Sequence, residues 1–421
     1  MRKIDAVKKL NAVFNAPPSK AHTLRALFIA SLADGKSFLR NALYADDQRH
    51  AANALALFGA RIDFDGKDFI VHGTAGKLVA PHKEVFVGNS GVTARFLVPL
   101  AALANGNSVI TGDARLKERP VSGLVSALEK LGAEASASEN GSFPVKVKGG
   151  GLEGGKTIVE GSESSQFLSA ILVSAPYTEK GVLAKVSGEL KSGPYVDITI
   201  DCMKSFGVLC VNHDYTEFFV KGKEMYKAQD YEIEGDYSSA SYFFAAAAIT
   251  GGKAKVNNLN PYSSQGDKKF LDLVSKMGCS LKKGKDFIEV KGKPMKGIGV
   301  DMADCPDIVP SIAVVAAVAK GKTKITGISH LAAKESNRIE SVAKNLEKCG
   351  VKCRYGADFL EIDGGKPHGT AINSFNDHRI AMAFSVLGLK TGGMIIDDEK
   401  VVSKSFPNFF GELENAYEGK E

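Results

Sequence analysis

The stretch "SKAHTLRALFIASLADGKSFLRN", residues 19–41, combines a polar beginning, an apolar interior and a glycine that precedes a strand-like segment. A helix that is apolar on all sides, as the middle of this stretch predicts, is normally buried in a protein core. Yet its first turns carry two cations, Lys20 and Arg25, with Ala21 directly after the first of them. The stretch therefore predicts a helix that is buried in the core, with a charged start whose role differs from core packing.

The same order of features recurs five more times along the chain. The later copies contain "SGVTARFL", "SSQFLSAIL", "SSASYFFAA", "PDIVPSIAV" and "DHRIAMAF". Successive closing glycines are 69 to 75 residues apart: Gly35, Gly106, Gly181, Gly252, Gly321 and Gly392. A second series, 71 to 75 residues apart, ends amphipathic helices and precedes a strand–turn–strand pattern: Gly59, Gly132, Gly207, Gly278 and Gly350. The repeating unit is thus about 70 residues of mixed helix and strand.

Six such units predict an α/β (α+β) protein with two similar domains. Each copy would hold one buried and one amphipathic helix against a small sheet, and three copies would pack around their apolar helices. The second domain would contain residues 17–233. The first would combine residues 1–16 with 234–421, so that the chain crosses between the domains near residues 17 and 233.

Composition narrows the possible functions. The 421 residues carry a formal net charge of +6, and the lysines and arginines are scattered. This excess favours small anionic substrates and is too diffuse to indicate nucleic acid. The sequence has no apolar run of the length of a membrane span and no signal-peptide core at its start. Its six cysteines read as reduced, buried thiols. We expect a cytoplasmic protein that binds neither nucleic acid nor membrane.

The starts of the apolar helices carry more charge than capping requires. Ser, Asn and Asp are ordinary N-cap residues, and capping explains Ser238 and Ser239. Cations at a helix N-terminus, in contrast, oppose the helix dipole at a cost of roughly 0.3–1 kcal/mol each. They become favourable where an anion also binds, which predicts an anion site at these helix starts. The cations concerned are Lys20, Arg25, Arg95, His378 and Arg379.

Polar clusters in three loops extend this pattern. Arg119 stands in "DARLKERP", and Lys404 stands in "VVSKSFP". The segment "AAKESNR" places Glu335 between Lys334 and Arg338. A carboxylate held among cations is kept ionised and can act as a base or a proton relay.

Ten short motifs now form a recognisable series. In chain order they are "PSK…R", "GNSG…R", "ERP", "SSQF", "SGPYVDIT", "GDYSSASYF", "PD", "KESNR", "NDHR" and "SKSFP". With these motifs the chain resembles the enolpyruvyl transferases, and among them the branch whose acceptor is shikimate 3-phosphate. The resemblance implies two domains of three βαβαββ-type repeats around buried helices, an inside-out α/β barrel, which agrees with the repeat count.

The resemblance also implies a reaction that needs no metal ion or other cofactor. The enolpyruvyl group of phosphoenolpyruvate would pass to the 5-hydroxyl group of shikimate 3-phosphate through a tetrahedral intermediate, with release of phosphate. Both substrates are small anions that must meet in one cleft, which accounts for the cations at the helix starts. The reaction would belong to the biosynthesis of chorismate and the aromatic amino acids, and we expect the enzyme to be a monomer.

The resemblance assigns roles residue by residue. Asp307 would take the proton of the attacking hydroxyl group, and Glu335, with Lys20, would deliver and remove the methyl-group proton, supported by His378. The phosphoenolpyruvate ligands would be Lys20, Gly91, Arg119, Gln166, Arg338, Arg379 and Lys404. The shikimate 3-phosphate ligands would be Arg25, Ser164, Ser165, Gln166, Ser192, Tyr195, Asp307 and Lys334.

Four positions depart from the family pattern, and all of them concern the acceptor pocket. Ala21 replaces a serine, Leu24 replaces the polar residue before the arginine, Val92 replaces a threonine, and His330 replaces an asparagine.

The sequence argues against three alternative functions. A relative that uses UDP-N-acetylglucosamine would have a reactive cysteine in "TGDARLKERP", where this chain has none. An RNA 3′-phosphate cyclase would need a histidine nucleophile and a basic face. A non-catalytic anion-binding relative would have lost Lys20, Asp307 or Glu335, all of which are present.

Overall fold

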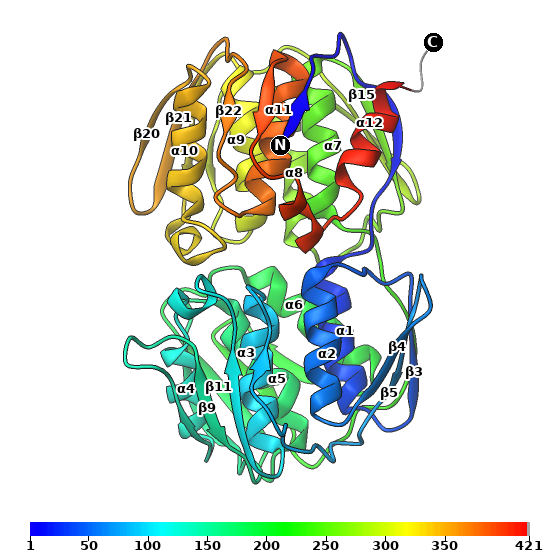
Figure 1. The fold of residues 1–421 in the computed structure, drawn as a ribbon, viewed down its shortest axis with the longest axis vertical. Helices are drawn as coiled ribbons and strands as arrows, with labels where there is room; N and C mark the ends of the chain where they lie inside the picture. The colour runs from blue at the N-terminus through cyan, green and yellow to red at the C-terminus, as the bar shows by residue number, and fades with distance from the viewer. Residues whose placement is uncertain (419–421) are drawn as a thin grey trace. The chain divides into compact units, whose positions relative to one another are not determined.

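The computed structural model describes residues 1–418, and its internal contacts divide the chain into two compact units, shown in Figure 1. Unit 2 is the continuous segment Pro18–Ile233. Unit 1 combines Met1–Pro17 with the chain from Glu234 onward. The chain therefore leaves unit 1 after residue 17 and returns to it after residue 233, within one residue of the crossings expected from the repeats.

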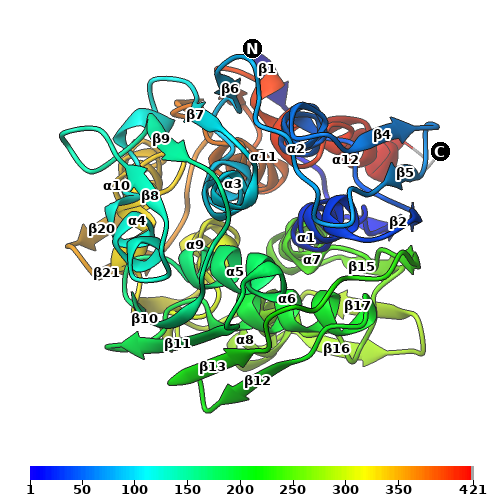
Figure 2. The same ribbon diagram turned by 90° about the horizontal axis from the view of Figure 1, so that it is seen from below.

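Unit 2 is built around helices that are buried along nearly their whole length. In α1, every residue from His22 to Leu32 is buried, because an almost wholly apolar helix has no face suited to water. Figure 2 shows the helices of this kind inside the unit: α1 (Lys20–Leu32), α3 (Gly91–Leu103) and α5 (Ser165–Ser174). Amphipathic helices alternate with them and bury one face: α2 (Asp46–Leu57), α4 (Ser122–Glu129) and α6 (Gly193–Ser205).

The sheets of unit 2 share one topology. In each, the first strand runs parallel to the second, and the other neighbours are antiparallel. The first sheet has the order β14 (Asp230–Glu232), β3 (Lys36–Arg40), β5 (Phe69–His72), β4 (Arg61–Phe64). The second is β6 (Val85–Phe86), β7 (Asn107–Thr111), β9 (Val145–Lys148), β8 (Glu134–Ser136). The third is β10 (Gly155–Glu160), β11 (Val182–Ser187), β13 (Glu217–Val220), β12 (Cys210–His213).

Unit 1 repeats this plan. Its buried helices are α7 (Tyr237–Thr250), α9 (Val309–Val318) and α11 (His378–Thr391), and they alternate with α8 (Lys269–Met277), α10 (Arg338–Lys348) and α12 (Phe409–Glu418). Two sheets have the orders β2 (Asn11–Asn15), β15 (Lys253–Asn257), β17 (Phe287–Lys291), β16 (Ser280–Lys283) and β18 (Gly299–Asp301), β19 (Gly321–Thr326), β21 (Phe359–Gly364), β20 (Lys352–Tyr355). The last sheet consists of β22 (Ala371–Ile372), β23 (Met394–Ile396) and β1 (Arg2–Ile4).

The predicted architecture of six α/β repeats in two similar units is confirmed. The N-terminal residues complete unit 1, because β2 pairs with β15 and β1 pairs with β23. Among residues 1–418, no helix is both long enough and apolar enough to cross a membrane.

Gly251 ends α7 in the left-handed conformation, with φ 70°, and Gly252 lies between this helix and β15, as the repeat pattern predicted. Two local predictions were wrong. Asp236 caps α7 by accepting a hydrogen bond from the Ser239 backbone, so the serines are not the caps. Cys210 and Cys353 are half-buried, because they lie on strands that are partly open to solvent.

Candidate active site

The first cation of unit 2 is held by a carboxylate. Ser19 caps α1, and Lys20 is its first residue. The Lys20 Nζ atom lies 2.5 Å from Oδ2 of Asp47, whose side chain is only 4% exposed. Sequence reasoning missed Asp47. Its only local signal is its place in the first turn of α2, where an acidic residue favours the helix in any protein.

Arg25 is a residue of α1, and its side chain reaches α6. Its guanidinium donates to Thr199 Oγ1 at 2.7 Å, to the Tyr195 carbonyl at 2.8 Å and to the Ala21 carbonyl at 3.1 Å. Burial lowers the pKa of Arg25 to about 10, although Cys202 and Tyr195 oppose this shift. The contacts fix a positive charge beside the start of α6, where the predicted residues Ser192 and Tyr195 also lie. Lys20 and Arg25 thus have different partners.

Gly91 and Arg119 are packed against each other at the start of α3. A Cβ atom at Gly91 would lie 2.5 Å from the Arg119 Cζ atom, so the missing side chain makes room for the guanidinium. Arg119 Nη1 donates to the Asn89 carbonyl at 3.4 Å. Arg119 is 3% exposed and follows the short 3₁₀ helix η1 (Leu116–Glu118). The structure therefore joins two residues that the resemblance assigned to phosphoenolpyruvate.

Arg95 connects α3 to α5. It donates to Gln166 Oε1 and to the Pro120 carbonyl, both at 2.8 Å. Ser164 caps α5 and accepts a hydrogen bond from the Gln166 backbone at 3.3 Å, and Ser165 is the buried first residue of the helix. Arg95 is one of the cations at the helix starts, and the resemblance assigns it no role. Its contacts position the predicted ligand Gln166.

The cluster in unit 1 is centred on Arg338. This side chain is 1% exposed and begins α10. It donates to Asp307 at 2.8 Å, to Glu335 at 2.6 Å and to Asp377 at 2.8 Å. Burial would lower the pKa of Arg338, but the carboxylates of Asp377, Glu335 and Asp307 raise it above its ordinary value. Arg338 is therefore a permanent cation surrounded by anions.

Asp377 is the carboxylate of this cluster that the sequence did not single out. It caps α11 by accepting from the Arg379 backbone at 3.0 Å. In the motif "NDHR" Asp377 has the position of an ordinary N-cap, so the sequence did not indicate its second contact, with Arg338. His378, the buried first residue of α11, has Nδ1 3.6 Å from Asp377 Oδ1.

Asp307 is shared by two arginines. It belongs to the 3₁₀ turn η4 (Pro306–Ile308), and its other carboxylate oxygen lies 2.7 Å from Nη2 of Arg379. Burial alone would raise the pKa of Asp307, but Arg379, Arg338 and Lys334 outweigh burial and lower it well below its ordinary value. In this state Asp307 is a weak base. An anion that drew the arginines away from it would strengthen it.

Glu335 completes the cluster. Its side chain is 9% exposed and lies between Arg338 and Lys404, whose Nζ atom is 3.9 Å from Oε1. Lys334 precedes it, after the turn η5 (Ser329–Ala333), and Lys404 ends η6 (Lys400–Lys404). The structure therefore brings the predicted acid–base residues of unit 1 into one network with the predicted cations.

The four departures from the family pattern differ in burial. Leu24 is buried in the hydrophobic core of unit 2. Ala21, Val92 and His330 are half-buried. Ala21 is the departure that touches a predicted ligand, because its carbonyl accepts from Arg25.

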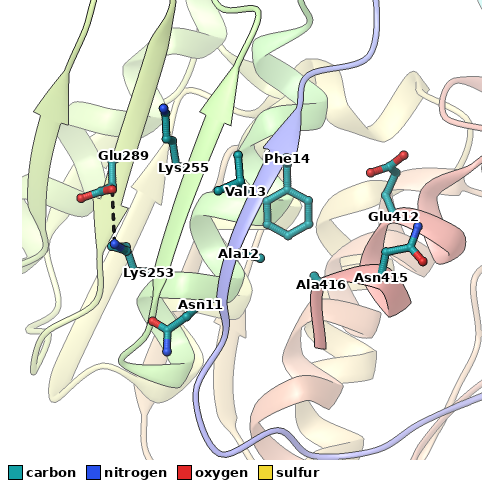
Figure 3. A pocket seen from close by; sticks show the side chains of 10 residues that line it. All are labelled: Asn11, Ala12, Val13, Phe14, Lys253, Lys255, Glu289, Glu412, Asn415 and Ala416. Atoms are coloured by element: carbon teal, nitrogen blue, oxygen red, sulfur yellow. Dashed lines mark ion pairs between the residues drawn. The ribbon is translucent and has the colours of Figure 1, made fainter. Parts of the chain in front are cut away.

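A pocket of about 630 Å³ lies elsewhere in unit 1, beside β2 and α12 (Figure 3). Its charged side chains include Lys253 and Glu289, which form an ion pair at 3.7 Å. The residues that line it do not include the predicted site residues. The clusters at the helix starts are therefore the stronger candidates.

Comparisons with known proteins identify the family of this chain. Residues 4–413 match the family described as EPSP synthase (3-phosphoshikimate 1-carboxyvinyltransferase). A 3-phosphoshikimate 1-carboxyvinyltransferase of Methanospirillum hungatei is 43% identical over 411 residues, which cover 96% of this chain and 95% of that protein. The protein of the same name from Salmonella arizonae is 40% identical over 97% of both chains. A solved EPSP synthase from Acinetobacter baumannii matches with a TM-score of 0.82 at 27% identity, covering 98% of this chain and 97% of that one.

Proposed function

Because this chain belongs to the EPSP synthase (3-phosphoshikimate 1-carboxyvinyltransferase) family, we propose that its two clusters of helix-start residues carry the reaction of that family. The chain is a transferase of the shikimate pathway. It moves the enolpyruvyl group of phosphoenolpyruvate to the 5-hydroxyl group of shikimate 3-phosphate and releases phosphate. The proposal concerns the residues that perform each step.

The proposed addition begins at the acceptor hydroxyl group. Its oxygen forms a bond to C2 of phosphoenolpyruvate while its proton passes to Asp307. The electrons of the C2–C3 double bond take a proton from Glu335, which enters this step as the carboxylic acid and leaves it as the carboxylate, and the methylene group becomes a methyl group. In the elimination Glu335 takes a methyl proton back, the double bond forms again, and the C2–oxygen bond to phosphate breaks. General acid–base groups of this kind typically contribute 10²–10⁴-fold to a rate.

The connection of Asp307 to Arg338 and Arg379 is the observation that carries this proposal. Both arginines are proposed ligands of phosphoenolpyruvate. When the substrate anion binds them, they neutralise Asp307 less, and its pKa rises toward the range of a useful base. Substrate binding would thus create the base that the reaction needs.

The remaining ligands are proposed from the residue matches and the geometry. Lys20, Gly91, Arg119, Gln166 and Lys404 are assigned to phosphoenolpyruvate, and His378 supports Arg379. Ser164, Ser165, Arg25, Ser192, Tyr195 and Lys334 are assigned to shikimate 3-phosphate. Holding both reactants in register supplies roughly 7–11 kcal/mol of barrier reduction in favourable systems. We further propose a cytoplasmic monomer without nucleic-acid partners.

A phosphate-release assay tests the function. We expect release when phosphoenolpyruvate and shikimate 3-phosphate are both present, and none when either is omitted. UDP-N-acetylglucosamine should not replace the acceptor. Phosphate release with UDP-N-acetylglucosamine, together with no release with shikimate 3-phosphate, would refute the assignment.

A serine at position 21 is expected to tighten the binding of shikimate 3-phosphate. Positions 21 and 25 lie one turn apart on the same face of α1, so a hydroxyl group at the half-buried position 21 is expected near Arg25, the proposed carboxylate ligand. One added hydrogen bond contributes roughly 0.5–1.5 kcal/mol, which corresponds to about 2–10-fold in Kd. Calorimetric titration of Ala21→Ser measures this change. Ala52→Ser, at a half-buried position of α2, is the control, and an unchanged or weaker affinity of Ala21→Ser would contradict the expectation.

A further inference from the structure

A carboxyl group with no assigned role is buried near Asp307. Asp267 belongs to the turn η3 (Gly266–Lys268), directly before α8, and is 3% exposed. One of its oxygens accepts a hydrogen bond from the hydroxyl group of Ser238, in the first turn of α7. A carboxyl group so completely removed from water must be neutral or closely balanced by its neighbours.

The turn that carries Asp267 is fixed on two sides. Toward α7, Gln265 accepts from the Tyr237 backbone at 2.9 Å and donates to the Gly235 carbonyl at 2.8 Å. Toward the segment that precedes Asp307, the Cys305 thiol donates to the Gly266 carbonyl at 3.2 Å. Asp267 therefore has a defined position relative to the proposed base.

The groups that face Asp267 come from several elements. Asp236 and Ser238 belong to the start of α7, Cys305 and Asp307 to the segment around η4, and Arg379 to α11. The lysines of its own segment are engaged elsewhere, because Lys268 donates to the Ser263 carbonyl and Lys269 to the Asp301 carbonyl.

These neighbours leave Asp267 able to change charge near neutral pH. Burial, followed by the charge of Asp307, raises its pKa to about 7, and Arg379 and the Ser238 hydroxyl group limit the rise. Two interacting carboxyl groups titrate as a pair, so the charge of each alters the proton affinity of the other.

We propose that Asp267 is a positioning residue that controls, through its charge, how readily Asp307 accepts the proton of the acceptor hydroxyl group. When Asp267 is ionised, its negative charge opposes the charge of Asp307 and makes proton transfer to Asp307 more favourable. When Asp267 is protonated, this effect is lost. The inference rests on the proposed role of Asp307 as the base and adds Asp267 as the group that changes the proton affinity of Asp307.

The test is the pH dependence of kcat in wild type, Asp267→Asn and Ser238→Ala, with saturating phosphoenolpyruvate and shikimate 3-phosphate. In wild type kcat should rise as pH increases through about 7, where Asp267 loses its proton. Asp267→Asn should lack this rise and be roughly tenfold slower than wild type at pH 8, the effect of about one pK unit between coupled groups. Its KM for phosphoenolpyruvate should not increase, because removing a negative charge near Arg379 does not weaken anion binding.

Ser238→Ala provides the second variant. The Ser238 hydroxyl group lowers the pKa of Asp267, so its loss should move the rise in kcat to higher pH without abolishing it. Ser241→Ala is the matched control on the same helix, because Ser241 bonds to the Ser238 carbonyl and to Ser311. Its profile should match that of wild type.

The outcomes separate this inference from the proposed function. The substrate phosphates titrate equally in all variants, so only differences between profiles count. If wild type transfers the enolpyruvyl group but Asp267→Asn keeps the same pH profile, the role of Asp267 is refuted. A shift of Ser238→Ala to lower pH would refute it as well. If wild type does not transfer the group to shikimate 3-phosphate at any pH, the proposed function itself fails.

Discussion

Replacement of Glu335 by glutamine is expected to lower kcat by about 10²–10⁴-fold, the usual contribution of a general acid–base group. Glutamine keeps the size of the side chain and can still accept from Arg338, which lies 2.6 Å from Glu335. It cannot give a proton to the methylene carbon or take one from the methyl group. Steady-state phosphate release and a single-turnover experiment would measure the loss.

The control for this variant is Glu340→Gln. Glu340 is an exposed residue of α10 that pairs with Lys344, so its neutralisation should leave kcat close to wild type. The circular dichroism spectra and thermal midpoints of both variants should resemble those of wild type. A Glu335→Gln enzyme that turns over at the wild-type rate would remove Glu335 from the proposed acid–base pair.

Replacement of Arg338 by alanine is expected to destabilise unit 1 by about 3–5 kcal/mol, the cost of breaking a buried ion pair by removing one partner. The change leaves the carboxylates of Asp307, Glu335 and Asp377 close together without the cation that they share. Urea unfolding at neutral pH measures the difference in the free energy of unfolding between wild type and Arg338→Ala. The transition to monitor is that of unit 1.

The stabilising effect of Arg338 should depend on pH. The pKa of Asp307 is lowered in the folded protein, so its contribution to stability is present above the unfolded value of about 3.9 and is lost as pH falls below it. The difference between wild type and Arg338→Ala should therefore shrink in acid. Arg354→Ala, which removes an exposed arginine 3.8 Å from Glu361, is the control and should cost less than about 1 kcal/mol. A loss this small for Arg338→Ala would contradict the prediction.

The fold could be predicted because its signals are local and repeated. Each buried helix has a polar beginning and an apolar interior, and a glycine follows it before the next strand, so the repeated pattern predicts the number of units and their order. The errors concern single residues. Asp236, Ser238 and Ser239 could each cap α7, and only the hydrogen bond that Asp236 accepts from the Ser239 backbone shows which of them does.

The sequence predicted part of the candidate site. Cations at helix starts are conspicuous because they oppose the helix dipole, so Lys20, Arg25 and Arg379 stood out. Asp307 and Glu335 were also predicted, but Asp47 and Asp377 were not, because acidic residues at the start of a helix look like ordinary helix-start residues. The contacts of Asp47 with Lys20 and of Asp267 with Ser238 form when the two helices of one repeat pack together, and the contact of Asp377 with Arg338 joins two repeats.

The pairing of β1 and β2 has a consequence for synthesis on the ribosome. Unit 2 is continuous, and its closing strand β14 comes at its end, so all strands of its sheets have been made once residue 233 has been added. The strands β1 and β2 are translated before unit 2, yet their partners β23 and β15 come from the second half of the chain. The sheets of unit 1 therefore cannot be completed until the chain on both sides of unit 2 has been made.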